Sequence, residues 1–189
     1  MKINGKSQYE IWAQFCVTKR CTDEIHSFFR NEYNVAPELL VPNLHLTIYH
    51  ARRPMPDLLE LEQSCNLSID TLDTRFMVLT PGGENPRSDI DPSKHKIGIR
   101  IKNSSSFKDI INQYRNLLFE HETSYVLGER RPSTKRRSAF GARYFQPHIA
   151  IIKPRNGIVT DLFEIGKNFR DCIQEIKFNK FIIYKVKNF

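Results

Sequence analysis

The sequence predicts an α+β protein built from two similar halves. Alternating apolar and polar residues predict half-buried strands, most clearly over residues 97–101, where isoleucine occupies every second position. Between such strands lie segments whose apolar residues recur at helical spacing. A histidine within an apolar, strand-like run occurs at a corresponding place in each half, at His45 and at His148. We therefore expect a duplicated α+β unit that forms one domain over residues 1–189.

The first half, over residues 9–86, is expected to alternate strands with helices. Its predicted elements are a strand at 9–17, a helix from Thr22 to about Tyr33, the His45 strand, a short helix over Leu58–Cys65 and a strand over Arg75–Thr80. Thr22 is predicted to cap the first helix, because a threonine hydroxyl can accept a hydrogen bond from a free N–H of the first turn. Asp57 and Glu60 have the spacing of a capping box, which predicts the short helix.

The second half, over residues 93–187, repeats this order. Its predicted elements are a strand at 97–101, a helix that opens at Ser106, the His148 strand, a helix capped by Thr160 and one or two strands between Ile173 and Val186. The helix after Ser106 has the strongest helical period in the chain. The two halves share this order of elements without a recognisable repeat of sequence.

The composition favours a globular protein with an anionic partner. Apolar residues make up 40% of the chain, and the net charge of +8 favours a nucleic acid or nucleotide, although many soluble proteins are equally basic. No apolar run approaches the roughly 20 residues of a membrane span, and residues 1–8 lack the apolar segment of a secretory signal. The four cysteines form no Cys-x-x-Cys pair, which argues against a zinc site, and the lack of a secretory signal favours reduced thiols over the alternative of disulfides. We expect a cytoplasmic monomer that does not bind membranes, or a nuclear one in a eukaryote.

The first histidine motif can present an imidazole and a hydroxyl together. It runs His45-Leu46-Thr47-Ile48-Tyr49 behind Pro42, a composition typical of a strand. Because side chains alternate along a strand, His45 and Thr47 share one face, and a regular strand adds Tyr49 to that face. The imidazole and the hydroxyl can then address one phosphate group, while Tyr49 can stack on a base or fill the core.

The second histidine motif, His148-Ile149-Ala150-Ile151, follows Pro147 and has the same pattern except at its third position. Two copies of the motif His-apolar-Thr/Ser-apolar are the signature of the 2H phosphoesterase superfamily, and the chain resembles this family. The family includes the 2′-5′ RNA ligases and several cyclic phosphodiesterases. His45–Ile48 matches the signature in full, whereas Ala150 replaces the hydroxyl residue. The resemblance implies a bilobal fold in which two antiparallel sheets face each other across a central groove, with helices on the outside.

The resemblance also implies catalysis by two histidines. His45 and His148 are expected to act as general acid and general base on a phosphodiester, in an order that the sequence leaves open. Thr47 is expected to bind the phosphate, and no metal or other cofactor is needed. The expected enzyme is a metal-independent phosphodiesterase that hydrolyses 2′,3′-cyclic phosphates or 2′-5′ linkages in RNA, oligonucleotides or nucleotides.

Ala150 is the departure from the signature, because its side chain carries no hydrogen-bond donor. Three outcomes are open: another residue replaces the hydroxyl, the enzyme is slower, or the site has kept binding and lost catalysis. The residues nearest in sequence that could contact the substrate instead are Arg143, Tyr144, Gln146 and Lys153. Arg143 also ends a basic segment, residues 128–143, which can gather phosphates or simply be solvated.

Two other functions remain open from the sequence. One is a non-catalytic or weakly active RNA-binding or nucleotide-binding protein on the same fold, in which Ala150 marks the loss of catalysis. The other is an unrelated α+β module that binds RNA and buries both histidines. This second alternative predicts that His45 and His148 lie far apart or on opposite sides of their sheets.

Overall fold

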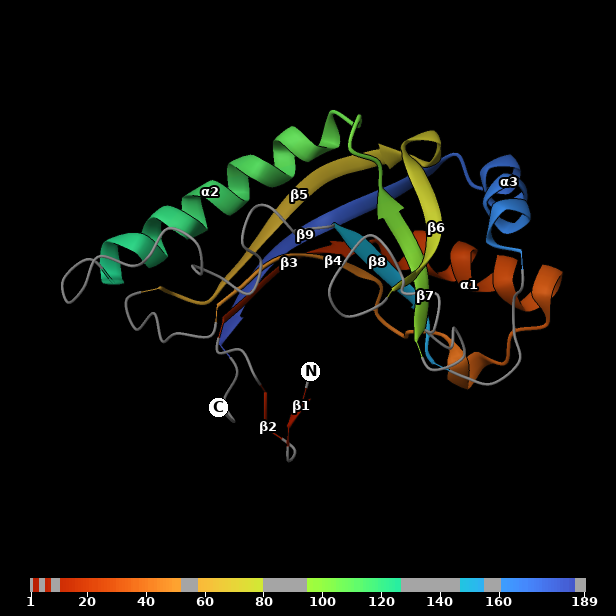
Figure 1. Ribbon diagram of the computed structural model, residues 1–189, viewed down its shortest axis with the longest axis horizontal. Helices are drawn as coiled ribbons and strands as arrows, with labels where there is room; N and C mark the ends of the chain where they lie inside the picture. Colours follow the sequence, from red (N-terminus) through yellow and green to blue (C-terminus); the bar gives the residue numbers. More distant parts are fainter. Residues whose placement is uncertain are drawn as a thin grey trace.

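A computed structural model describes residues 2–3, 6–7, 11–51, 58–79, 95–126, 147–154 and 161–185. These residues form an α+β fold in which three α-helices lie against one large antiparallel sheet (Figure 1). The helices are α1 (Lys19–Tyr33), α2 (Phe107–Val126) and α3 (Leu162–Cys172), with short 3₁₀ turns η1 (Pro37–Leu39) and η2 (Thr71–Asp73). The α+β class predicted from the sequence is confirmed.

Among the described residues, seven strands form the large sheet, while β1 (Lys2–Ile3) and β2 (Lys6–Ser7) pair with each other. The seven strands are β3 (Ile11–Val17), β4 (His45–Ala51), β5 (Leu61–Asp70), β6 (Thr74–Leu79), β7 (Lys96–Ile101), β8 (His148–Ile152) and β9 (Glu175–Lys185). Their order across the sheet is β5-β9-β3-β4-β8-β7-β6, and every neighbouring pair is antiparallel.

The sheet is continuous, whereas the resemblance implied two separate sheets. The two histidine strands, β4 and β8, lie side by side at its centre and pair through Leu46 and Ile149. The last strand of each half pairs with the first strand of the other half, β6 with β7 and β9 with β3. This exchange ties the two halves together on both sides of the central pair, and one hydrogen-bonded sheet results.

Strand β5 replaces the helix predicted over Leu58–Cys65. Glu60 does not cap a helix, because its Oε1 accepts a hydrogen bond from the backbone N–H of Lys185 at 2.9 Å. From Cys65 to Ile69 exposure instead alternates residue by residue, as in a half-buried strand. β9 is 11 residues long, and its ladder with β5 satisfies backbone groups that a local helix at 58–65 would leave unpaired.

Two helix caps differ from the predicted residues. Thr18, not Thr22, caps α1, because its Oγ1 accepts a hydrogen bond from the backbone N–H of Cys21 at 3.2 Å. Asp161 caps α3 by accepting hydrogen bonds from two backbone N–H groups of the first turn, both at 2.9 Å. The predicted cap Thr160 lies outside the described residues. In both helices the cap satisfies N–H groups that the first turn leaves free.

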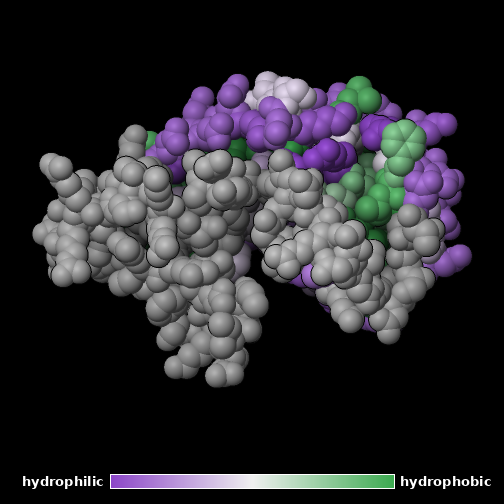
Figure 2. Space-filling view, in the orientation of Figure 1, coloured by the Kyte–Doolittle hydropathy of each residue, from purple (hydrophilic) through white to green (hydrophobic). Residues whose placement is uncertain are grey.

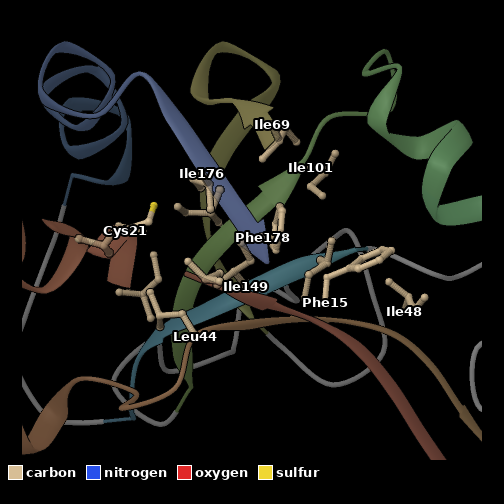
Figure 3. Close-up of a cluster of buried hydrophobic side chains, with 14 of the residues drawn as sticks. Phe15, Cys21, Leu44, Ile48, Ile69, Ile101, Ile149, Ile176 and Phe178 are labelled. Atoms are coloured by element: carbon tan, nitrogen blue, oxygen red, sulfur yellow. The ribbon is translucent and has the colours of Figure 1, made fainter. Parts of the chain in front are cut away.

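A row of buried side chains crosses the sheet and places the core on one face. Its members, each paired with the next across neighbouring strands, are Phe76, Ile99, Ile149, Leu46, Phe15 and Phe181. None of these side chains is more than 8% exposed. Figure 3 shows Ile149 and Phe15 within this cluster, beside Phe178 of β9.

The three helices pack on this same face of the sheet. Phe15 meets Tyr114 of α2 with ring centroids 5.0 Å apart. Phe76 meets Phe29 of α1 at 5.7 Å and Phe169 of α3 at 5.0 Å. The helices thus cover the core, and the other face of β4 and β8 carries the remaining side chains of the histidine strands.

Within the part of the chain that the structure describes, no helix combines the length and the apolar character needed to cross a membrane. Figure 2 shows a mostly hydrophilic surface over α2, with some apolar side chains exposed near β6 and α3. Two large apolar residues that are well exposed are Leu72 at 64% and Phe163 at 83%. Single exposed apolar side chains of this kind are normal on protein surfaces.

Candidate active site

The sheet face opposite the core, here called the histidine face, carries both predicted catalytic residues. Leu46 of β4 and Ile149 of β8 pair with each other, and both are buried in the core. Because side chains alternate along a strand, the residues next to them point the other way, and these include His45 and His148. The alternative function of an unrelated RNA-binding module predicted the opposite arrangement, with the two histidines far apart or on different faces of their sheets.

Four half-buried residues form a square at the centre of the histidine face. Continuing the antiparallel register from the central pair places Thr47 opposite His148 and Ala150 opposite His45. The two histidines therefore occupy one diagonal of the square, and positions related in this way lie roughly 7–8 Å apart at Cα. Side chains the size of imidazole can reach a single phosphate group from both ends of such a diagonal.

The register of β3 and β7 gives the next residues on either side of the square. His45 pairs with Cys16, Thr47 with Gln14, Ala150 with Gly98, and His148 with Arg100. On the β3 side, Gln14 Nε2 donates to Cys16 Sγ at 3.7 Å. The square thus has neutral polar neighbours on β3 and a charged neighbour on β7.

His45 is held in one tautomer by the chain just before its strand. Its Nδ1 lies 2.9 Å from the carbonyl oxygen of Asn43, and since a carbonyl can only accept, Nδ1 carries the proton. In the neutral ring Nε2 is then the nitrogen with the free lone pair. Burial lowers the pKa of His45 below its ordinary value, the Asn43 carbonyl partly opposes this, and the positive charge of Lys96 lowers the pKa further. A neutral imidazole with an available Nε2 suits a general base.

Two residues of β7 belong to the surroundings of the square but were not among the predicted site residues. Arg100 pairs with His148 and is only 2% exposed, and Lys96 is close enough to His45 to lower its pKa. The sequence contains a pattern that could have pointed to both residues, because Lys96 and Arg100 alternate with the isoleucines of residues 97–101. The alternation assigns them to one face of β7, but it does not show that β7 lies beside β8.

Tyr49 does not share the histidine face, although a regular strand predicts that it does. Ala13 pairs with Tyr49 while the next residue, Gln14, pairs with Thr47, so Ile48 is an extra residue in a β-bulge. Ile48 and Tyr49 are both in the core, at 0% and 1% exposure. This burial is incompatible with the predicted stacking of Tyr49 on a substrate base, and its alternative role in the core is the one observed.

The other predicted substrate contacts are not brought to the square within the described residues. Lys153 lies just past the end of β8, where its Nζ donates to the carbonyl oxygen of Glu38 at 2.7 Å. Its backbone N–H also donates to the carbonyl oxygen of Leu39 at 2.8 Å. Lys153 therefore links η1 to the end of β8 through these two hydrogen bonds. Arg143 and Tyr144, with the rest of the basic segment and Gln146, lie outside the described residues.

A surface hollow of about 730 Å³ lies along α1 and the C-terminal end of α3, away from the square. Two ion pairs, each 2.9 Å long, join Lys19 to Asp23 and Arg20 to Glu24 in its lining. These charges are matched within the helix, and none of the predicted site residues that the structure describes lines the hollow.

No protein-family model matches the chain, and no curated protein matches it. Among the residues described by the structure, no group of three or more histidine, cysteine, aspartate or glutamate side chains could hold a metal ion.

Proposed function

We propose that the protein is a 2H-type phosphodiesterase that hydrolyses 2′,3′-cyclic phosphates or 2′-5′ linkages in RNA, oligonucleotides or nucleotides. The observation that carries this proposal is the diagonal placement of His45 and His148 on one face of adjacent strands. Thr47 adds a hydroxyl to the same face, at the corner opposite His148. The two imidazoles can perform both proton transfers of the reaction, so the proposed mechanism is metal-independent.

For a 2′,3′-cyclic phosphate, the proposed reaction begins with attack of water on phosphorus. His45 takes a proton from this water at Nε2, because its Nδ1 is occupied by the hydrogen bond to Asn43. His148 donates a proton to the ribose oxygen that leaves when its bond to phosphorus breaks. Thr47 donates a hydrogen bond to a phosphate oxygen, where negative charge develops in the transition state. The product is a phosphate monoester on the other ribose oxygen.

The topology supports the duplication that a 2H-type fold requires. β3, α1 and β4 of the first half correspond to β7, α2 and β8 of the second half, and the exchanged strands β6 and β9 occupy corresponding positions. Under this proposal the two lobes are the halves of the sheet on either side of the β4–β8 pair. The substrate then lies over that pair and meets one histidine from each half.

A second candidate function is nucleotide or RNA binding without efficient turnover. Ala150 is the observation that favours it, since the corner opposite His45 carries no donor. Loss of one preorganised donor typically costs about 10²–10³ in rate. This loss slows an enzyme but does not abolish the acid–base chemistry of two histidines.

The proposed function is tested by turnover in excess EDTA on three substrates. These are a 2′,3′-cyclic nucleotide, a 2′-5′ linked oligoadenylate and an RNA that ends in a 2′,3′-cyclic phosphate. We expect hydrolysis of at least one, and the one hydrolysed fastest identifies the substrate class. If wild type binds a substrate tightly but hydrolyses none, the binding protein is the better description, and if it neither binds nor hydrolyses any, the proposal is wrong.

A histidine outside the histidine face provides the matched control. His26 lies on α1, and a ring nitrogen is 3.0 Å from the carbonyl oxygen of Val41. His26→Gln should retain turnover within about threefold, whereas His45→Gln should lose about 10²–10⁴-fold, the usual contribution of a general base. Circular dichroism spectra of both variants would confirm that neither change unfolds the protein.

A further inference from the structure

We propose that Arg100 makes the phosphate contact that Ala150 cannot make, an inference that rests on the proposed function. Ala150 is flanked on β7 by Gly98, and a Cβ added there would lie 2.2 Å from the carbonyl oxygen of Ile149. A donor therefore cannot be supplied from position 98 without moving the backbone of β8. The neighbouring residue on the same face of β7 is Arg100, which pairs directly with His148.

The chemistry of Arg100 suits a phosphate oxygen. Its guanidinium offers five N–H donors in a plane that matches two phosphate oxygens. At 2% exposure the Arg100 side chain is buried on the histidine face, beside the square. Neighbouring strands are about 4.8 Å apart, a distance that an extended arginine side chain exceeds.

The contact between Arg100 and Asn103 is long enough to be exchanged for a substrate contact. Nη2 of Arg100 donates to Asn103 Oδ1 at 3.4 Å, while Lys108 Nζ donates to the same oxygen at 2.6 Å. The closer lysine can keep this oxygen satisfied if the guanidinium turns away. A charged phosphate oxygen is a stronger acceptor for arginine than an amide oxygen is.

A second arginine on the same face also favours an anionic ligand. Arg75 of β6 pairs directly with Arg100, and Arg75 is exposed. Two like charges directly opposite each other on neighbouring strands destabilise a sheet. An anion bound beside them reverses this contribution, so the ligated state is favoured over the free state.

Together these contacts give the phosphate donors from two sides. Thr47 approaches from β4 and Arg100 from β7, with the histidine diagonal between them. The guanidinium offsets the negative charge that develops on the non-bridging oxygens, which is the role of the absent hydroxyl at position 150. Arg100 thus acts by contact with the substrate, while the two histidines move the protons.

The test is whether a hydroxyl at position 150 can substitute for the guanidinium. Turnover of a 2′,3′-cyclic nucleotide and binding of a nucleoside 3′-monophosphate would be measured for wild type, Arg100→Gln, Ala150→Ser and the double variant. We expect Arg100→Gln to lower kcat/KM by about 10²–10³-fold and Ala150→Ser to restore at least about tenfold of this loss in the Arg100→Gln background. Ala150→Ser in wild type should change kcat/KM less than about threefold. Arg30→Gln, at an exposed arginine of α1 on the core side of the sheet, is the matched control and should change it by less than about fivefold.

The outcomes distinguish a failure of the inference about Arg100 from a failure of the proposed function. If wild type is active and Arg100→Gln retains kcat/KM within threefold, or if Ala150→Ser gives no rescue, the inference about Arg100 is wrong and the enzyme assignment stands. If wild type hydrolyses nothing, the proposed function fails, and unchanged monophosphate binding by Arg100→Gln would then overturn the role of Arg100. Should Arg100→Gln not fold, Arg100→Lys keeps the charge without the paired donors, and it should lose about tenfold in kcat/KM with a native spectrum.

Discussion

At the scale of single residues, the backbone before β4 decides which proton His45 can exchange. The Asn43 carbonyl fixes the proton on Nδ1, so Nε2 is the nitrogen that faces a reaction. Burial and the charge of Lys96 both keep the ring neutral by lowering its pKa. A base of this kind becomes protonated, and therefore inactive, only when the pH falls below the ordinary pKa of histidine, about 6.5.

Removal of the Lys96 charge should raise the pKa of His45. Lys96 favours the neutral ring by electrostatic repulsion of the imidazolium, and Lys96→Gln removes this repulsion. We expect the NMR titration of His45 to move to higher pH in the variant, together with the acidic limb of kcat/KM. Lys102→Gln, on the exposed side of the segment after β7, is the control and should leave both curves unchanged. A shift to lower pH in Lys96→Gln would contradict this description of the site.

The burial of Tyr49 makes a prediction that distinguishes a core residue from a stacking residue. Within the described residues its hydroxyl is buried without a hydrogen-bond partner. Tyr49→Phe removes this group, so the free energy of unfolding should stay equal or rise by up to about 1 kcal/mol. Tyr33→Phe should instead lower it by about 1 kcal/mol, because Tyr33 Oη accepts a hydrogen bond from Asn168 Nδ2 at 3.0 Å. Urea denaturation measures both, and a loss of more than about 1 kcal/mol in Tyr49→Phe would contradict the assignment.

At the scale of elements, the histidine strands were predictable and their irregularities were not. The alternation over residues 11–17 correctly predicted the buried face of β3. The isoleucines of residues 97–101 are buried as predicted, but Gly98 and Arg100 on the other face are buried as well, so β7 is not the half-buried strand that the alternation predicted. The bulge at Ile48 was not predictable, because it depends on the register with β3 and leaves no mark in the sequence of β4. The error at β5 has the same origin, since a capping pattern is local and the ladder with β9 is not.

The attachment of α2 to the sheet depends on Phe15. This fully buried ring meets four other rings, at centroid distances from 5.0 to 6.3 Å, which are those of Phe107, Tyr114, Phe178 and Phe181. Phe15→Ala should lower the free energy of unfolding by about 3–5 kcal/mol, the usual cost of such a cavity. Phe163→Ala is the matched control, because Phe163 is 83% exposed and its removal should change stability by less than about 0.5 kcal/mol. Equal losses in the two variants would contradict the assignment of the core to the Phe15 face.

At the scale of the whole molecule, the sequence predicted the order of the large-sheet strands and helices except at β5, but it did not predict how the halves join. The resemblance implied a separate sheet for each half, and the strand pattern could not correct this, because it does not say which strands pair. The structure exchanges β6 and β9 between the halves and joins the histidine strands directly. This joining brings His45 and His148 to one diagonal, and it also brings Arg100 beside His148. The histidines could be proposed from their local sequence, whereas Arg100 required knowledge of the β7–β8 pairing.

The central claim is that His45 and His148 act on one phosphodiester in the same step. Its most direct test is kcat on the best substrate of the panel for His45→Gln, His148→Gln and the double variant, in excess EDTA. Residues that act as a unit have strongly non-additive effects. We predict that each single change removes about 10²–10⁴-fold of kcat and that the double variant falls no further than the worse single variant. Two single losses that multiply in the double variant, or full activity in either single variant, would contradict the claim.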